Sequence, residues 1–513
     1  MKKYLYYLML LLIPLVSCEK DNLDSKILEG TQAGDATTKV DLAASKEFFT
    51  VIGQSNPVVD LPAVQNAVDN YDRITLSGVF DFGSDEITGG VDITRPNVIL
   101  KGPATILNGA KTQSVPELGK LRVPISIRAP GVEVRDIEFN CNHDGILVYV
   151  QENGKPVVIY SNTVSVGEFG GGVAIAATPG GIKVLNNTIS AFYPYLAIET
   201  TGNTEIVQNE MQECFECVFI FGFDHKLDIL DNIMSTNSFA FEGMFIGSWQ
   251  VTTETGPDWG DNPPVRIIDN TIEIEGIDAA GIIVGTSAHG INNTLVKGNV
   301  ITGTGGYSGL LKEPYGRNNR FINNDLSGLT TYGPQLWLHG GRNNHFQNNK
   351  LGSVLPIPGG GFAPVQQDAA TLVSTVNWHL NDGLNTPDPL NEGNHFSNND
   401  YGQTGVSGWS EDTGSIGAVL LLDFIQRFDS DGFPFEEPFA MENFVSEKKF
   451  PAGTDLCDQV LDIGGTNHIA GWKACESHTK MAYEMASKSY KNFGQRHKDR
   501  NRKRMEILEK FRE

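Results

Sequence analysis

A short pattern of alternating apolar and polar residues, closed by an asparagine, recurs along the chain between residues 158 and 401. Most intervals between successive asparagines are 22 to 29 residues; one of 38 contains an insertion, and the last, of 50, spans two periods. A fixed period of this length is typical of a solenoid. The repeated asparagines are Asn162, Asn187, Asn209, Asn232, Asn270, Asn299, Asn324, Asn349 and Asn399.

A second apolar segment follows each asparagine-bearing segment, for example at 172–176, 217–221 and 281–284. Both segments have the length and composition of short strands, so each period predicts one coil of stacked parallel strands about 4.8 Å apart. We expect ten to twelve coils over about 97–405. The asparagines are expected to hydrogen-bond from coil to coil as a ladder, and to adopt the left-handed backbone of a tight turn.

The stretch before the coils has a different pattern. Apolar residues at 61–71 have helical spacing with Pro62 in the first turn, and 73–80 and 91–102 read as strands. This order resembles the N-terminal cap of the pectate-lyase-like superfamily, where a helix covers the open end of a right-handed parallel β-helix. The resemblance implies an all-β fold: a right-handed parallel β-helix over 46–475 with an N-terminal capping helix, followed by a helical C-terminal tail at 476–513.

Residues 1–18 have the features of an export signal: Lys2 and Lys3, a short apolar run, and then Leu15-Val16-Ser17-Cys18. The ending resembles the lipobox of bacterial lipoproteins, which implies lipidation of Cys18 and anchoring in the envelope of a Gram-negative bacterium, at the outer membrane. An ordinary signal peptide with an incidental cysteine is the alternative. Residues 19–45 are polar and predict a flexible tether.

The net charge of the chain restricts the classes of function that it can have. The net charge of −23 excludes a nucleic-acid-binding body, and we expect a monomer. Residues 476–513 reverse this balance, with 11 Lys/Arg against 6 Asp/Glu. This composition favours a solvated helical tail or a loose cap; the alternative is a tail that docks on the acidic body or on an anionic polymer.

Metal and disulfide signals are sparse. Cys214 and Cys217 form a single CxxC without a partner motif, so zinc is not expected; these cysteines read as small interior residues, although an exported chain can oxidise its thiols. Residues 429–432 resemble the start of a calcium loop but lack the remaining ligand spacing. Calcium is therefore the one cofactor that the sequence suggests, and no metal is expected at the candidate site.

No complete catalytic motif of a β-helix enzyme family is present. The chain lacks the Asp-Asp and Arg-Ile-Lys motifs of polygalacturonase-like enzymes and the Asp-Pro-His of alginate epimerases. The stretch from Arg122 to Arg128 is close to a pectate-lyase motif but has one residue too many, and reads as a strand. Four insertions, at 110–123, 250–264, 353–368 and 381–393, interrupt the period where a β-helix can build a binding site.

The candidate site rests on position. The C-terminal ends of the second strands are expected to stack into one column, where acid–base pairs can act on a sugar polymer. Polar residues at strand ends also simply face solvent, which is the plain alternative. The column predicts Glu199, Asp224, Glu313 and His339 as catalytic residues and Trp249, Trp259, Trp337 and His289 as substrate-binding residues.

Three functions fit these observations. The first is an envelope lipoprotein whose β-helix binds, and cleaves or modifies, an extracellular polysaccharide, as a lyase, hydrolase or epimerase. The second is a non-catalytic glycan-binding or adhesin-like protein. The third is a periplasmic metal-handling β-helix, which would need clustered Met, His or Cys, whereas the 9 Met and 10 His are scattered.

Overall fold

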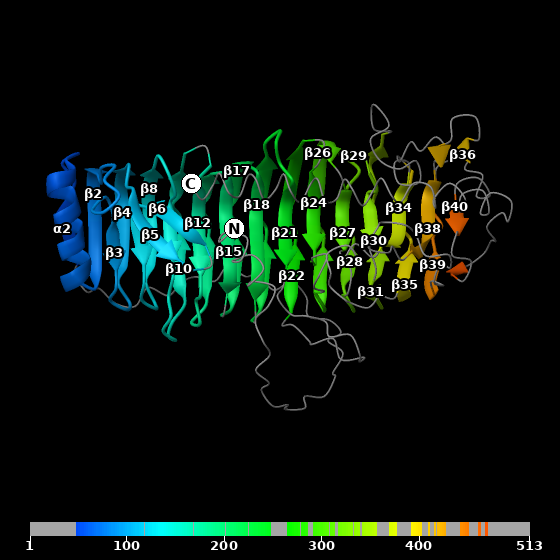
Figure 1. The fold of residues 1–513 in the computed structure, drawn as a ribbon, viewed down its shortest axis with the longest axis horizontal. Coiled ribbons are helices and arrows are strands. Elements are labelled where there is room, and N and C mark those ends of the chain that lie inside the picture. Colours follow the sequence, from blue (N-terminus) through cyan, green and yellow to red (C-terminus); the bar gives the residue numbers. More distant parts are fainter. Residues whose placement is uncertain are drawn as a thin grey trace, which may run out of the picture. The chain divides into compact units, whose positions relative to one another are not determined.

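The computed structural model describes most of the chain from residue 48 to residue 469, and its strands form a parallel β-helix (Figure 1). The described ranges are 48–116, 118–167, 169–200, 202–223, 225–247, 264–276, 279–285, 291–306, 308–312, 316–331, 333–338, 341–355, 369–376, 391–402, 409–410, 415–416, 418–426, 442–450, 460–462 and 467–469. The export signal, the tether and the basic tail lie outside them. Among the described residues, no helix is long and apolar enough to cross a membrane.

Two parallel sheets run along the stack. Sheet B has 13 described strands, one for each coil. They are β3(Val91–Ile93), β7(Ile125–Ile127), β9(Ile146–Val148), β12(Gly171–Ala176), β15(Tyr193–Thr200), β18(Glu216–Phe223), β21(Glu242–Gly247), β24(Ala280–Val284), β27(Ser308–Lys312), β30(Leu336–Leu338), β34(Ala369–Val376), β38(Ala418–Gln426) and β40(Val460–Asp462).

Sheet A has 24 described strands, because most coils contribute two. They are β1(Phe49–Ile52), β2(Arg73–Asp81), β4(Ile99–Leu107), β8(Glu133–Asn140), β10(Val157–Tyr160), β11(Thr163–Ser165), β13(Ile182–Leu185), β14(Thr188–Ser190), β16(Thr204–Val207), β17(Glu210–Cys214), β19(Leu227–Leu230), β20(Ile233–Thr236), β22(Val265–Ile268), β23(Thr271–Glu275), β25(Thr294–Lys297), β26(Val300–Gly306), β28(Arg320–Ile322), β29(Leu329–Thr331), β31(Gly341–Arg342), β32(His345–Gln347), β33(Ser353–Val354), β35(Asn391–Ser397), β39(Glu442–Ser446) and β41(His468–Ile469).

The core lies between the two sheets. Successive strand residues face opposite sides, so one residue in two points inward, and parallel register stacks it on its equivalent in the next coil. In sheet B the pairs Met244↔Ile282 and Ile282↔Leu310 are fully buried in this way. In sheet A the rings of Phe321 and Phe346 stack with their centroids 4.6 Å apart.

The predicted asparagine ladder is present. From Asn187 onward, the Oδ1 atom of each ladder asparagine accepts two hydrogen bonds from the asparagine of the preceding coil. At Asn270 these come from the backbone N of Asn232 at 3.0 Å and from its Nδ2 at 2.9 Å. The Nδ2 of Asn270 then donates to Asn299 of the following coil at 2.9 Å and to the carbonyl of Ile229 at 3.0 Å. The ladder therefore satisfies polar groups that the turn buries.

The left-handed backbone lies one residue earlier than predicted. Positive φ angles occur at Asn186, Gln208 and Asp231, each directly before a ladder asparagine, and not at the ladder asparagines themselves. The preceding residue makes the turn with an outward side chain, so the ladder asparagine can direct its amide into the stack.

A second asparagine ladder, absent from the sequence analysis, runs parallel to the first over the later coils. Its asparagines stand five residues before those of the first ladder, as in the pairs 319 and 324, 344 and 349, and 394 and 399. The Nδ2 of Asn319 donates to Asn344 at 2.9 Å, and Asn344 donates to Asn394 at 2.9 Å. The constant five-residue offset is the signal that could have revealed it.

Helix α2(Pro57–Asn70) lies at the N-terminal end of the stack (Figure 1). It starts one turn earlier than predicted, because Asn56 caps it by accepting a hydrogen bond from the N of Val58 and Pro57 fills the first position. Pro62 therefore lies inside the helix rather than in its first turn. Val64 packs into the core. That the helix is required to protect the end of the core stays a prediction.

The insertion at 110–123 forms an antiparallel hairpin of β5(Lys111–Val115) and β6(Gly119–Val123). Its anchor is the buried carboxylate of Asp144, which accepts from the backbone N of Arg122 at 2.8 Å and of Gly171 at 2.9 Å. Burial raises the pKa of Asp144 to about 6. The same carboxylate thus ties the hairpin to the first residue of β12.

Replacing Asp144 with alanine is expected to lower the free energy of unfolding by about 2 kcal/mol, because two backbone N–H groups lose their acceptor. Urea unfolding followed by circular dichroism measures this. Asp69→Ala, on the exposed face of α2, is the control and should change stability by less than about 0.5 kcal/mol. An equal, small effect of both substitutions would show that the hairpin is held by other contacts.

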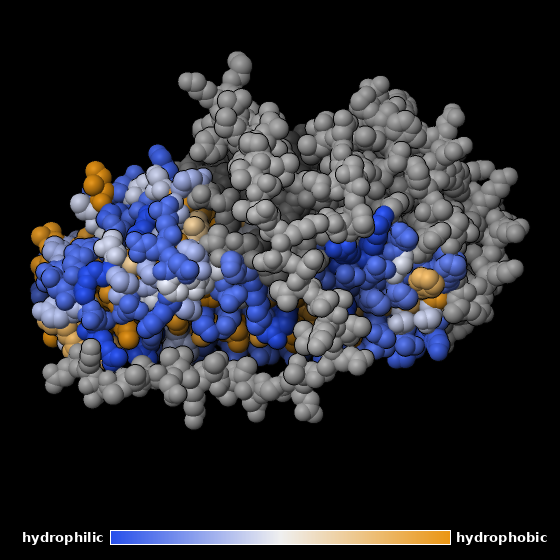
Figure 2. Space-filling view, turned by 90° about the horizontal axis from the view of Figure 1, so that it is seen from below, coloured by the Kyte–Doolittle hydropathy of each residue, from blue (hydrophilic) through white to orange (hydrophobic). Residues whose placement is uncertain are grey.

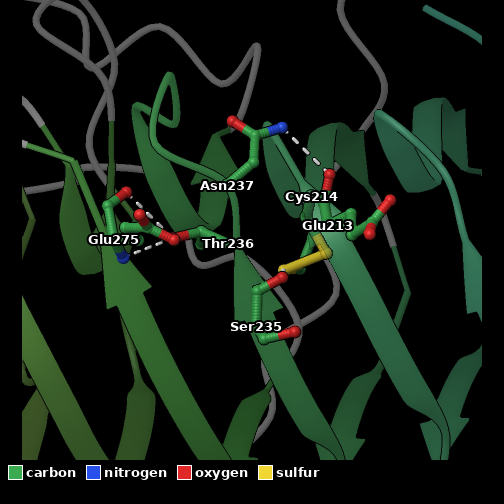
Figure 3. The surroundings of a disulfide bond; sticks show 7 residues. Glu213, Cys214, Ser235, Thr236, Asn237 and Glu275 are labelled. Carbon is green, nitrogen blue, oxygen red and sulfur yellow. Dashed lines mark hydrogen bonds between the residues drawn. A yellow bond between two sulfur atoms is a disulfide. The ribbon is translucent and has the colours of Figure 1, made fainter. Parts of the chain in front are cut away.

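A disulfide joins Cys214, the last residue of β17, to Cys217, the second residue of β18 (Figure 3). Both side chains are buried, as expected for interior positions. Next to the disulfide, the Nδ2 of Asn237 donates to the carbonyl of Glu213 at 3.0 Å. Cys141 is a free, buried thiol whose pKa burial raises to about 12; Cys18, Cys457 and Cys475 lie outside the described residues. The disulfide therefore closes the corner that carries Glu216.

Two short strands complete the described elements: β36(Trp409–Ser410) pairs antiparallel with β37(Ser415–Ile416). The described surface that faces the viewer in Figure 2 is mainly hydrophilic, with hydrophobic residues in small separate groups. This polarity agrees with an acidic, solvent-facing exterior.

Candidate functional site

The residues predicted to form the site follow the C-terminal ends of neighbouring strands of sheet B. Asp224 directly follows β18, Glu313 follows β27, His339 follows β30, and Glu199 is the last residue but one of β15. These strands belong to one parallel sheet, in which β21 and β24 lie between β18 and β27, so their C-terminal ends lie along a single edge. The side chains of all four residues lie outside the described part of the structure, as do those of Trp249, Trp259 and His289.

Strand register subdivides the predicted set. Lys312 and Leu338 are paired in register, and Glu313 and His339 are the residues that follow them. Lys312 and Leu338 thus hold equivalent places in adjacent coils. Counted along the same register, Glu199 lies two residues beyond the place in β15 that corresponds to the end of β27.

The described start of this edge carries Arg128 and Tyr149. They directly follow Ile127 and Val148, a pair in register between β7 and β9. The guanidinium of Arg128 lies over the ring of Tyr149, 4.9 Å from its centroid. This is a cation–π arrangement with a planar, hydrogen-bonding group on an aromatic face.

Hydrogen bonds fix both side chains. An Nη2 of Arg128 donates to Gln113 of the hairpin at 2.6 Å, and the hydroxyl of Tyr149 accepts from the Nε2 of Gln151 at 2.6 Å. Arg128 and Tyr149 are half-buried, and burial lowers the pKa of Arg128. Arginine nevertheless stays protonated at neutral pH because its ordinary pKa exceeds 12. The pair therefore presents a fixed positive charge and an aromatic ring to solvent.

A second carboxylate links this pair to the hairpin. Asp92, in β3, accepts from the Nζ of Lys111 at 2.7 Å and from the Nε2 of Gln113 at 2.8 Å. The network runs from β3 through the hairpin to Arg128. Sequence reasoning missed Arg128 and Tyr149 because it counted positions from the ladder asparagines, the first of which is Asn162. The usable signal is a polar or aromatic residue directly after a three-residue apolar strand.

The outer face of sheet B, beside this edge, is apolar. One register column of outward positions holds Leu147, Ala174, Leu196, Phe219, Phe245, Ile283, Leu311 and Trp337. The rings of Phe219 and Phe245 stack with their centroids 5.1 Å apart. Trp337, predicted to contact substrate, is only 2% exposed. Contact of this ring with a sugar stays a prediction.

Two buried glutamates stand at the opposite margin of the same face. Glu216 and Glu242, the first residues of β18 and β21, are paired in register and are 0% and 2% exposed. Buried carboxylates need cationic or hydrogen-bonding partners to offset the loss of hydration. Tyr193, the first residue of β15, lies at the same margin, with its ring 6.4 Å from that of Phe219. This margin is therefore acidic and aromatic.

Within the described ranges, no group of three or more His, Cys, Asp or Glu residues is arranged to hold a metal ion. Residues 429–432, where the sequence suggests calcium, lie outside those ranges.

Comparison with known proteins shows that the chain is similar to solved structures in its fold alone. No protein-family model matches the chain, and no curated protein matches it. Similar solved structures include the A-modules of the Azotobacter vinelandii mannuronan C-5 epimerases AlgE4 (11% identity, TM-score 0.38) and AlgE6 (12%, 0.39), each match covering 82% of this chain and 96% of the module. Tailspike protein 3 of bacteriophage CBA120 is similar at 12% identity and TM-score 0.35, over 83% of this chain and 62% of the tailspike. Such low similarity transfers no activity.

Proposed function

We propose that the protein is a lipid-anchored envelope protein whose β-helix binds an extracellular polysaccharide along the C-terminal edge of sheet B and cleaves or modifies it. Lipidation of Cys18 and outer-membrane location are part of this proposal, supported by the N-terminal sequence. The observation that carries it is the Arg128–Tyr149 pair, which directly follows the paired strands β7 and β9 at the C-terminal edge of sheet B.

The dimensions favour a polymer. From β9 to β27 there are six strand-to-strand steps, which at about 4.8 Å each span roughly 29 Å. A single sugar cannot reach from Tyr149 to Glu313, whereas an extended chain of several sugars can. The ring of Tyr149 would pack against a sugar face, and the guanidinium of Arg128 would pair with a carboxylate or hydroxyl of the polymer. This charge partly offsets the repulsion between an acidic protein and an anionic glycan.

Glu313 and His339 would supply acid–base chemistry. One would remove a proton from the sugar or from an attacking water, and the other would donate a proton to the leaving oxygen. Imidazole titrates near neutral pH, so His339 can carry out either step under physiological conditions. Lys312 and Leu338, the residues before this pair, are in register in neighbouring strands, and neighbouring strands lie about 4.8 Å apart, a spacing that one sugar can bridge. Lyase, hydrolase and epimerase chemistry all use such a pair.

Arg128→Ala is expected to weaken binding of the responsive polysaccharide at least tenfold, which corresponds to about 1.4 kcal/mol. The matched control is Arg95→Ala, because Arg95 pairs with the exposed Asp72 near α2, away from this edge. The protein lacking residues 1–18 is screened against uronic-acid and neutral polysaccharides, following retention, unsaturated products and new reducing ends. An equal effect of both substitutions would remove Arg128 from the site.

Substitution of Glu313 or His339 by Gln separates catalysis from binding. For an enzyme, product formation falls at least a hundredfold while retention on the polysaccharide is unchanged. Retention by the unsubstituted protein without any product identifies the non-catalytic glycan-binding alternative. If the unsubstituted protein is retained on none of the polysaccharides and forms no product from them, the proposed function is wrong.

A further inference from the structure

The guanidinium of Arg128 is held by a neutral amide rather than by a carboxylate. Its Nη2 donates to the Oε1 of Gln113 at 2.6 Å, and within the described residues Arg128 forms no ion pair with a carboxylate. By contrast, Arg95, Arg122 and Arg266 each pair directly with a carboxylate at 2.6 Å. The positive charge of Arg128 therefore remains available to a ligand.

The amide of Gln113 bridges two opposite charges. Its Nε2 donates to the Oδ1 of Asp92 at 2.8 Å, while its Oε1 accepts from Arg128. The Oδ2 of Asp92 accepts from the Nζ of Lys111 at 2.7 Å, so both oxygens of this carboxylate have a donor. A reversed amide would turn its oxygen toward the carboxylate and its N–H groups toward the guanidinium, and neither contact is a hydrogen bond. The amide is thus fixed, and it separates Arg128 from Asp92.

The β5–β6 hairpin holds Gln113 at a fixed place relative to the coils. Gln113 follows Thr112, which pairs in register with Arg122. The backbone N of Thr112 donates to the carbonyl of Glu86 at 2.8 Å, and the backbone N of Arg122 donates to the buried Asp144 at 2.8 Å. The guanidinium of Arg122 also pairs with the carboxylate of Glu86. Both strands of the hairpin are therefore tied down next to Gln113.

We propose that Gln113 is the positioning residue of this edge: it holds the guanidinium of Arg128 over the ring of Tyr149 and leaves the charge of Arg128 unpaired for an anionic group of the ligand. A glutamate in its place would orient Arg128 but cancel its charge, and an alanine would release the guanidinium. The ligand part of this inference rests on the proposed function. The orientation of Arg128 by Gln113 does not.

Iodination of Tyr149 in the full chain, followed by peptide mass spectrometry, measures the position of Arg128 without any ligand. In Gln113→Ala the guanidinium leaves the ring, and we expect Tyr149 to react about threefold faster than in the unsubstituted protein, as in Arg128→Ala. Gln113→Glu keeps the accepting oxygen and should react at the unsubstituted rate. The matched control is Ser114→Ala, at the next, exposed position of β5. Equal rates in Gln113→Ala and Ser114→Ala would overturn the positioning role.

Retention on polygalacturonate and alginate, with dextran as the uncharged comparison, tests the ligand part. Gln113→Ala and Gln113→Glu should each weaken retention on the acidic polymer about tenfold, the first by misplacing the charge of Arg128 and the second by cancelling it. Because Gln113 acts through Arg128, Gln113→Ala should cause no further loss in the Arg128→Ala background. Ser114→Ala should bind as the unsubstituted protein does.

Unchanged retention of Gln113→Glu would show that the charge of Arg128 is not used, and an additional loss in the double variant would show that Gln113 contacts the ligand itself. Either result overturns the inference, as does retention of the unsubstituted protein on dextran alone. Retention on none of the three polymers would remove the ligand part, whereas the iodination rates of Tyr149 would still decide whether Gln113 orients Arg128. The two failures are thereby distinguishable.

Discussion

Replacing Asn270 with alanine is expected to lower the free energy of unfolding of the coils around it by about 4 kcal/mol. The side chain is fully buried in the middle of the first ladder. Without this side chain, the N and the Nδ2 of Asn232 lose their acceptor. The Oδ1 of Asn299 and the carbonyl of Ile229 each lose a donor. Each buried polar group left without a partner costs about 1–3 kcal/mol, and the neighbouring bonds share part of the loss.

Native-state hydrogen exchange of β19, β22 and β25 measures this effect, because coils of a solenoid can open locally. The control is Asn66→Ala, on the exposed face of α2, which should leave stability within about 0.5 kcal/mol. Asn270→Asp should be nearly as harmful as alanine, because it keeps an acceptor but places a charge in the stack. Wild-type protection of β22 in Asn270→Ala would rule out the ladder as a main source of stability.

Glu447 is expected to make the C-terminal coils less stable as the pH rises. It occupies the place after Asn399 in the first ladder, where its two oxygens accept from the N of Asn399 at 2.7 Å and from its Nδ2 at 2.6 Å. The hydroxyl of Tyr401 also donates to it, at 3.1 Å. Burial raises the pKa of Glu447 to about 7 despite these donors.

The direction of this change in stability with pH follows from the number of protons that the folded and unfolded states bind. Between the ordinary pKa of about 4.5 and the folded value of about 7, the folded state holds a proton that the unfolded state has released. The free energy of unfolding therefore falls as the pH rises through this window. The full difference corresponds to about 3 kcal/mol.

Hydrogen exchange or thermal unfolding of β35 and β39 at pH 5, 6, 7 and 8 measures the Glu447 effect. Glu447→Gln removes the titrating group and should flatten the dependence across this range. Glu392→Gln is the control, since Glu392 is exposed and pairs with Arg342 on the surface. A pH profile that is the same for wild type and Glu447→Gln would assign the dependence to another group.

The asparagine period predicted the coils because the ladder requires asparagine at the same turn position of every coil. A residue type that recurs at a fixed interval can be recognised in a single sequence. The start of α2 was misplaced because Asn56 and Pro57 supply an earlier cap, one turn ahead of the apolar pattern.

The site was harder to predict, because side-chain columns depend on register at strand ends and the ends vary in length. β15 extends to Thr200 whereas β30 stops at Leu338, so a fixed count from the ladder asparagine mixes two register positions. The pairing of Arg128 with Tyr149 depends on the hairpin that positions Gln113, and residues 111–123 carry no clear alternation.

The first ladder has a direction, because every asparagine accepts from the coil before it and donates to the coil after it. Any interior coil is therefore interchangeable with its neighbours in hydrogen bonding, and duplicating one whole period, such as residues 300–324, preserves every donor and acceptor. Glu447 is different, since a carboxylate accepts from Asn399 but has no amide to pass on. Whole periods can thus be added between Asn162 and Asn399 without interrupting the first ladder, whereas Glu447 ends it.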